Sequence, residues 1–203
     1  MAKRFFETFP ALILEDELKD LFEFAEVTAL KYNRDRTAIH VYLLCRRLIS
    51  KPQIYAVESK IEKQMFPDGD MKIRIFESFS LSEQYTPSYL VVYKDSLFAE
   101  IKRRSDLDYH ILMRADWKVA DDDSLLLTLE DSLWARNRAG ELREWIQMVF
   151  YDRCAISIPV AVSFKERDTT AIEEEKKRAE AQAIARIMKA NSVASKEKED
   201  EFI

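Results

Sequence analysis

Glycine is scarce in this 203-residue chain, which contains only Gly69 and Gly140. Phosphate-binding loops need several glycines at fixed spacing, because the backbone amides must approach the phosphate without side chains in the way. Neither the GxGxxG pattern of dinucleotide-binding domains nor the GxxxxGK[ST] pattern of P-loop enzymes can be written here. The GxxG loop with which K-homology domains clamp nucleic acid is missing for the same reason.

Cysteine and histidine are equally scarce, with two residues of each. Cys45 and Cys154 have neither CxxC spacing nor the framework of a secreted mini-domain, so we expect both to be reduced and packed. His40 and His110 have no second histidine or cysteine at ligand spacing, and no nucleophile elbow is present. We therefore predict structural roles for both histidines, no catalytic, metal or cofactor-binding residue, and no enzymatic activity of this segment itself.

Long apolar runs are also missing. The longest, such as "YLVVY" and "SLLLTL", fall far short of the roughly 20 residues that span a bilayer. The start "MAKRFFETFP" lacks the apolar core of a signal peptide, so we predict a cytoplasmic protein with no membrane partner. Since no binding motif is present, we also expect no small-molecule substrate. A formal net charge of −5 argues against a generally basic nucleic-acid coat, although a local basic patch is compatible with it.

Alternating and helical patterns predict the fold. Residues 26–32 and 37–43 alternate on either side of the polar turn "NRDR", which indicates a hairpin. Pro52 opens a helix whose apolar residues share one face, and the strand "MKIRIF" follows with Met71, Ile73 and Ile75 on its buried side. The apolar helix residues are Ile54, Val57, Ile61 and Met65.

The same order recurs further along the chain. "DWKVA" and "SLLLTLE" flank a turn at residues 121–123, a helix follows, and "ISIPVAVSF" alternates up to Phe164. The helix places Leu142, Ile146, Val149 and Phe150 on one face. Pro159 indicates an edge strand or a bulge. We predict an α+β fold of two consecutive small K-homology-like units, residues 1–80 and 81–167, each a strand-strand-helix-strand sheet backed by helices.

Two helices lie outside these sheets. Thr86 is a cap for a helix that begins at Pro87, with Leu90, Tyr93, Leu97 and Ile101 along one face. From residue 168 to residue 203 the chain becomes strongly charged, and Thr170 with Glu173 forms a capping box. We predict an exposed helix there, followed by a disordered linker.

Clustered acids and bases are the candidate chemical groups. Residues 121–123 are three aspartates, but adjacent carboxylates do not converge on one metal ion, so we predict a solvated turn. The basic clusters can contact phosphates or a partner protein, although acids surround each of them and favour solvated surface. The candidates are Arg46, Arg47, Lys102, Arg103, Arg104, Arg136 and Arg138, with Lys72 and Arg74 on one strand face.

Several blocks together resemble a known family. They include "FFETFPAL", "LSEQYTPSYLVVYKDSL" and "ADWKVADDDSLLLTLEDS", and their order and spacing are similar to the extreme N-terminus of the PolC-type DNA polymerase III alpha subunit, from about Phe5 to Glu166. The resemblance implies a DNA-directed DNA polymerase with 3'-5' exonuclease as the parent chain. Its magnesium and its zinc or manganese would bind elsewhere, after a following OB-fold domain that this segment does not reach.

The resemblance implies a docking role in DNA replication. Our leading hypothesis is a non-catalytic protein-interaction module that binds replisome proteins such as the clamp-loader tau subunit, helped by sheet edges that are open to a partner strand. The alternative is an auxiliary nucleic-acid-binding module that holds template or primer DNA, with weak binding that falls with salt.

Overall fold

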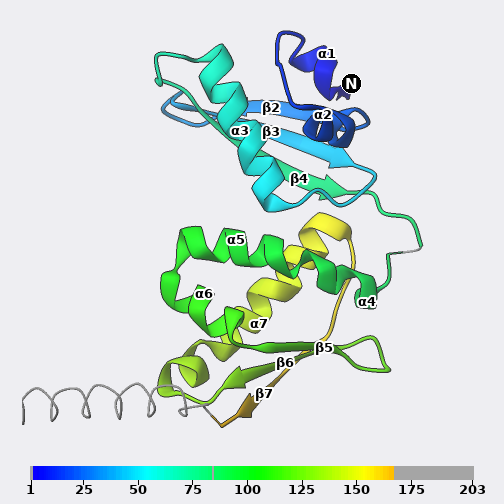
Figure 1. The fold of residues 1–203 in the computed structure, drawn as a ribbon, viewed down its shortest axis with the longest axis vertical. Coiled ribbons are helices and arrows are strands. Elements are labelled where there is room, and N and C mark those ends of the chain that lie inside the picture. Colours follow the sequence, from blue (N-terminus) through cyan, green and yellow to red (C-terminus); the bar gives the residue numbers. More distant parts are fainter. Residues whose placement is uncertain (1, 84, 167–203) are drawn as a thin grey trace, which may run out of the picture. The chain divides into compact units, whose positions relative to one another are not determined.

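The structure is a computed structural model that describes residues 2–83 and 85–166 (Figure 1). Residues Met1–Lys165 form one compact unit with two separate sheets. One sheet has four strands in the order β1-β2-β3-β4, and the other has three in the order β5-β6-β7. The predicted α+β class is therefore confirmed. The predicted charged helix after residue 167 lies outside the described residues.

The first sheet follows the predicted strand-strand-helix-strand order. Its strands are β1 (Lys3–Arg4), β2 (Glu26–Tyr32), β3 (Ala38–Cys45) and β4 (Lys72–Phe79). β2 and β3 form the antiparallel hairpin, and β4 runs parallel to β3 after the crossover helix α3 (Lys51–Met65). Strand β1 was not predicted, because a strand of two residues has no alternation to recognise.

Helices pack on one face of this sheet. α1 (Phe5–Thr8) and α2 (Asp16–Phe22) precede the hairpin, and α3 lies along the sheet (Figure 1). Ile54, Val57 and Ile61 of α3 are fully buried, as predicted. Met65 is not, because it ends the helix and is 37% exposed.

Strand β4 alternates between the two faces of the sheet. Ile73, Ile75 and Phe79 are buried, while Lys72, Arg74 and Phe76 are exposed. Glu58 and Glu62 of α3 reach over the free edge of β4 and accept hydrogen bonds from the N–H groups of Ile75 (2.7 Å) and Ile73 (2.8 Å). These two positions of the edge are therefore occupied and do not offer donors to a further strand.

The helix predicted from Pro87 is broken into three pieces. They are α4 (Pro87–Leu90), the 3₁₀ turn η1 (Val91–Tyr93) and α5 (Lys94–Arg104), and an additional helix α6 (Asp106–Met113) follows. The predicted face is nevertheless buried, since Leu90, Tyr93, Leu97 and Ile101 are all at most 3% exposed. The predicted apolar residues are therefore buried although the helix type changes along this segment.

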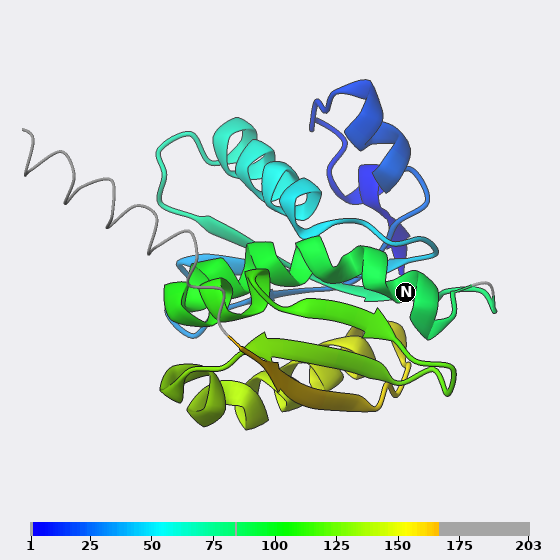
Figure 2. The ribbon, with the colours of Figure 1, turned by 60° about the horizontal axis from the view of Figure 1, so that its bottom comes forward.

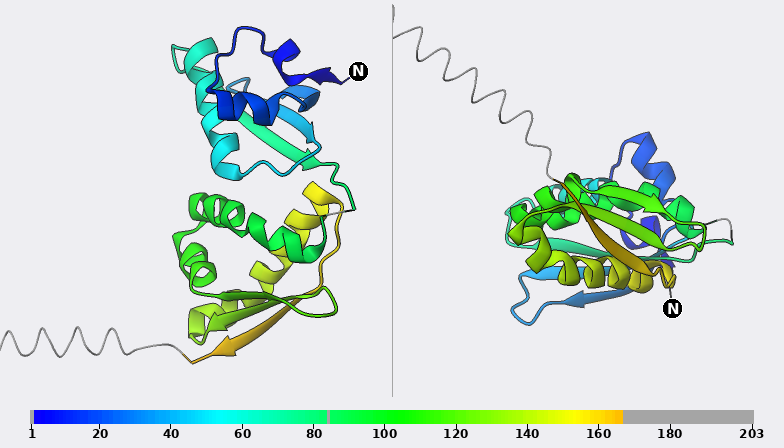
Figure 3. Two further views of the ribbon diagram at one scale, coloured as in Figure 1. Left: turned by 45° about the vertical axis from the view of Figure 1, so that its right-hand side comes forward. Right: turned by 90° about the horizontal axis from the view of Figure 1, so that it is seen from below.

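The second sheet repeats the topology of the first. β5 (Asp116–Val119) and β6 (Leu125–Glu130) are antiparallel, and β7 (Val160–Lys165) runs parallel to β6 after helix α7 (Leu133–Cys154). α5, α6 and α7 lie on one side of this sheet (Figures 2 and 3). The other side carries polar pairs, such as the hydroxyls of Thr128 and Ser163 at 2.8 Å.

The last strand is shorter than predicted. It begins only at Val160, and residues 156–159 precede it in extended or irregular backbone. Pro159 cannot donate to a ladder, but its carbonyl accepts a hydrogen bond from the N–H of Leu125 (2.8 Å). β7 is an edge strand, as Pro159 indicated. Phe164, predicted to be inward, is 38% exposed.

Candidate functional site

The predicted basic candidates fall into three groups. Arg46 and Arg47 follow β3 and are exposed, and they line a pocket of about 410 Å³ together with Phe24 and Glu26. The guanidinium of Arg47 also donates to the backbone carbonyl of Asp20. This pair therefore lies at one end of the first sheet, next to α2.

Arg136 and Arg138 lie near the start of α7 and are held by acids. Arg136 forms a two-bond contact with Asp131 at 2.6 and 2.7 Å. Arg138 forms the same kind of contact with Asp108 at 2.8 and 2.7 Å and also pairs with Glu141. Such fork-like pairs occupy the donors that would otherwise bind a phosphate.

The cluster at the end of α5 is different. Lys102, Arg103 and Arg104 are all exposed. The guanidinium carbon of Arg103 lies 3.3 Å from the ring centre of Tyr55 in α3, and Lys102 lies over the ring of Tyr109 at 5.1 Å. Neither Arg103 nor Arg104 forms an ion pair with a carboxylate of the described residues.

Arg103 and Arg104 line a second pocket, of about 650 Å³, which runs along the free edge of β4. Arg74 of β4 lines it as well, so the structure brings together arginines from two of the predicted clusters. Its aromatic lining residues are Tyr42, Tyr55 and Phe76. We call these six side chains the β4 groove.

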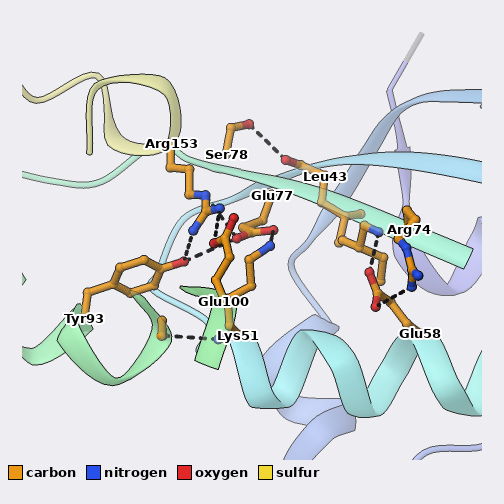
Figure 4. Close-up of polar contacts among 11 residues, drawn as sticks. Leu43, Lys51, Glu58, Arg74, Glu77, Ser78, Tyr93, Glu100 and Arg153 are labelled. Atoms are coloured by element: carbon orange, nitrogen blue, oxygen red, sulfur yellow. Dashed lines mark hydrogen bonds and ion pairs between the residues drawn. The ribbon is translucent and has the colours of Figure 1, made fainter. Parts of the chain in front are cut away.

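A buried ion-pair network forms the floor of this region (Figure 4). The side chain of Glu77 is fully buried, and its carboxylate contacts Lys51 Nζ at 2.7 Å and Arg153 Nε at 3.3 Å. The hydroxyl of Tyr93 donates to the same carboxylate at 3.3 Å, and Arg153 also pairs with Glu100. Three side chains, from α3, η1 and α7, therefore meet at the carboxylate of Glu77 in β4, and Glu100 of α5 joins them through Arg153.

Two further contacts complete the network. The N–H of Lys51 donates to the hydroxyl of Ser96 in α5 at 3.1 Å, which joins α3 to α5 (Figure 4). Throughout residues 2–83 and 85–166, every buried side-chain nitrogen and oxygen has a hydrogen-bond partner. A buried charge is tolerated only when it is paired and fully hydrogen-bonded in this way.

The environment shifts several pKa values. Burial opposes the charge on Arg153, but Glu77 and Glu100 outweigh it and hold the pKa of the guanidinium above its ordinary value. Burial, reinforced by Glu77, raises the pKa of the Tyr93 hydroxyl, which stays a donor. Burial likewise raises the pKa of Glu58, and its hydrogen bond from Ile75 only partly offsets this. Arg153 and Tyr93 therefore keep their protons near neutral pH.

Sequence reasoning missed Glu77 as a key residue. Its position in the alternation could have identified it, because Glu77 lies on the same, buried face of β4 as Ile73 and Ile75. A glutamate in a buried strand position requires a cation, but the alternation alone does not identify that cation. Lys51 and Arg153 come from helices before and after the strand.

Within the described ranges, the two histidines and the three aspartates do not form a catalytic or metal-binding group. His40 packs its ring edge-on against Phe76 at 5.1 Å between centroids, and His110 contacts its neighbour Tyr109. Residues 121–123 form an exposed turn, with Asp123 in the left-handed region at φ 60°. In the part of the chain that the structure describes, no group of three His, Cys, Asp or Glu side chains is placed to hold a metal ion.

These features define a class of protein: a small α+β unit with a buried polar network and an exposed groove of aromatic and basic side chains. Residues 4–75 match the family described as DNA polymerase III polC-type N-terminus I. The match ends in the middle of β4, and it confirms the predicted resemblance to the N-terminus of PolC-type DNA polymerase III over this segment. A comparison with curated proteins found no match. None of the helices in the described ranges is both long and apolar enough to cross a membrane.

Proposed function

We propose that the whole chain is a non-catalytic interaction module of a PolC-type DNA polymerase III, and that it docks a protein of the replication machinery. The clamp-loader tau subunit is the first candidate. The match over residues 4–75 supports the link to replication. The docking role is supported by the surface of the second half of the compact unit.

The observation that carries the docking role is an apolar pair on the first turn of α7. Trp134 is 62% exposed and the adjacent Leu133 is 72% exposed. Tryptophan supplies a large rigid contact area and is the residue type most enriched among binding hot spots. Leu133 and Trp134 thus expose two large apolar side chains on one helical turn, and exposed apolar area of this kind supports a protein-binding surface.

The test measures binding of the chain to purified clamp-loader tau subunit by isothermal titration. We expect Trp134→Ala to weaken binding at least tenfold, about 1.4 kcal/mol or more, because a hot-spot ring is removed. Thermal unfolding of the variant checks that the fold is retained.

Tyr151→Ala is the matched control. Tyr151 is on the same helix and is 63% exposed, but it lies about 25 Å further along the axis at 1.5 Å per residue. Its removal should leave the affinity unchanged. Equal losses in both variants, or no binding of the unaltered chain to the tau subunit or to other replication proteins, would contradict the proposal.

A further inference from the structure

The β4 groove combines two features that can bind a ligand: exposed arginines and an exposed aromatic stack. Its volume of about 650 Å³ lies within the range of ligand-binding pockets. The groove is separate from the Trp134 surface and belongs to β3, β4, α3 and α5.

The charges of the groove do not cancel once the ion pairs are assigned. Four acids line it, but Glu77 and Glu100 are occupied by Lys51 and Arg153. Glu58 accepts from the N–H of Ile75 and lies 3.8 Å from Arg74. Asp152 is the remaining acid.

Among the described residues, Arg103 and Arg104 have no ion pair with a carboxylate, and they face this one free acid together with Arg74, whose pair with Glu58 is long. Arg74 is 53% exposed and makes only the long contact with Glu58. Arg103 stacks its guanidinium on Tyr55, which leaves the N–H edge free to donate, and Arg104 is exposed beside it. The groove therefore offers donors to an anion from two elements, β4 and α5.

The aromatic side chains form a stack on the sheet. Phe76 and Tyr42 are register partners in β4 and β3, and their rings are stacked with centroids 5.3 Å apart and planes 19° from parallel. Phe76 is 46% exposed even though Tyr42 covers one face of its ring. Because β4 is the edge strand, the other face of Phe76 is turned away from β3, toward the groove.

We propose that the β4 groove binds single-stranded nucleic acid. A base continues the Tyr42–Phe76 stack, and Arg74, Arg103 and Arg104 bind the flanking phosphates. Proteins that hold single strands without sequence preference use this combination of stacking surfaces and basic side chains. Acidic residues of a peptide would use the arginines but have no planar group to continue the stack, so the stack favours a nucleic acid. The proposal does not depend on protein docking at Trp134.

The test is fluorescence anisotropy of the full chain with a labelled single-stranded oligothymidylate at several salt concentrations. Three phosphate contacts give a slope of about −2 in log K against log salt, so a fourfold rise in salt should weaken binding about 20-fold. Each of Arg74→Gln, Arg103→Gln and Arg104→Gln should reduce the slope by about 0.7. Phe76→Leu should weaken binding about tenfold without changing the slope, because it removes stacking and no charge.

Arg136→Gln is the matched control, since Arg136 is an exposed arginine on α7 that is already paired with Asp131. It should change neither the affinity nor the slope. Circular dichroism confirms that each variant is folded. Three results would overturn the proposal: no binding at low salt, an equal loss in Arg136→Gln, or competition by polyglutamate as strong as that by unlabelled oligothymidylate.

Discussion

Replacing Glu77 by glutamine should destabilise the protein far more than the same change at the surface. Among the described residues, Glu77 is the one carboxylate that pairs with both Lys51 and Arg153, and its side chain is fully buried. Glutamine has nearly the same size and keeps a hydrogen-bonding group, so the variant removes the charge with little change in packing. Two cations that are 8% and 13% exposed would then lose their main counter-charge.

The expected loss is about 3–5 kcal/mol in the free energy of unfolding. This is the range for breaking a buried ion pair on one side, because the uncompensated charge remains in a region of low dielectric. Glu100 still pairs with Arg153, and its partial exposure of 29% moderates the loss on that side. Lys51 has no such second acid among its ion pairs in the described residues, so its desolvation dominates the cost.

Urea unfolding followed by circular dichroism and by tryptophan fluorescence measures this loss. Glu130→Gln is the matched control: Glu130 pairs with Arg114 at 3.5 Å, and that arginine is 52% exposed. Surface pairs of this kind contribute about 0–1 kcal/mol. If Glu77→Gln costs no more than Glu130→Gln, the buried network does not stabilise the fold in the way argued above.

Two further predictions concern ionisable groups elsewhere. The pKa of Asp108 is held below its ordinary value by the hydrogen bonds from Arg138, so its stabilising effect is present above about pH 4 and is lost as the pH falls through the lowered pKa. Asp108→Asn should cost about 1–2 kcal/mol at neutral pH, and the difference in urea midpoints from the unaltered chain should vanish in acid; a constant difference would contradict it. Burial raises the pKa of the Cys45 thiol to about 12 and that of Cys154 to about 11, so both should react slowly with a disulfide reagent at about pH 8 until the chain is unfolded. Rapid labelling of either thiol in the folded protein would refute this.

Local pattern was enough to predict most of the fold. Period-two alternation located β2, β3, β6 and the start of β4, and helical spacing located α3 and α7. These signals work because one face of each element is buried against the core. The polarity of each residue therefore indicates whether its position is buried or exposed. Pro159 was informative for a different reason: it has no backbone N–H, so it cannot donate to a neighbouring strand, which indicates an edge.

The binding groove and the network could not be predicted in this way, because they depend on residues that are distant in the sequence. Arg103 contacts Tyr55 through packing of α5 near α3, and Arg153 reaches Glu77 from the last turn of α7. The sequence contains all of these residues, but no spacing rule connects them. The same limit explains why Arg136 and Arg138 were grouped with Arg103, although acids already hold them in the folded protein.

The buried network and the β4 groove are physically linked through α5. Glu100 points to Arg153, while Arg103 and Arg104 follow it by three and four residues and therefore lie on the same side of the helix. The contact of Ser96 with Lys51, one turn before Glu100, fixes the other end of this helical segment. Glu77 of β4 is thereby linked to α5 through Arg153 and Glu100. Arg103 and Arg104 of α5 line the same groove as Phe76 of β4. A nucleic acid has a regular phosphate spacing, so a groove that binds it needs a fixed distance between the basic side chains and the aromatic stack. The buried ion pair fixes this distance and leaves the exposed surface free for the ligand.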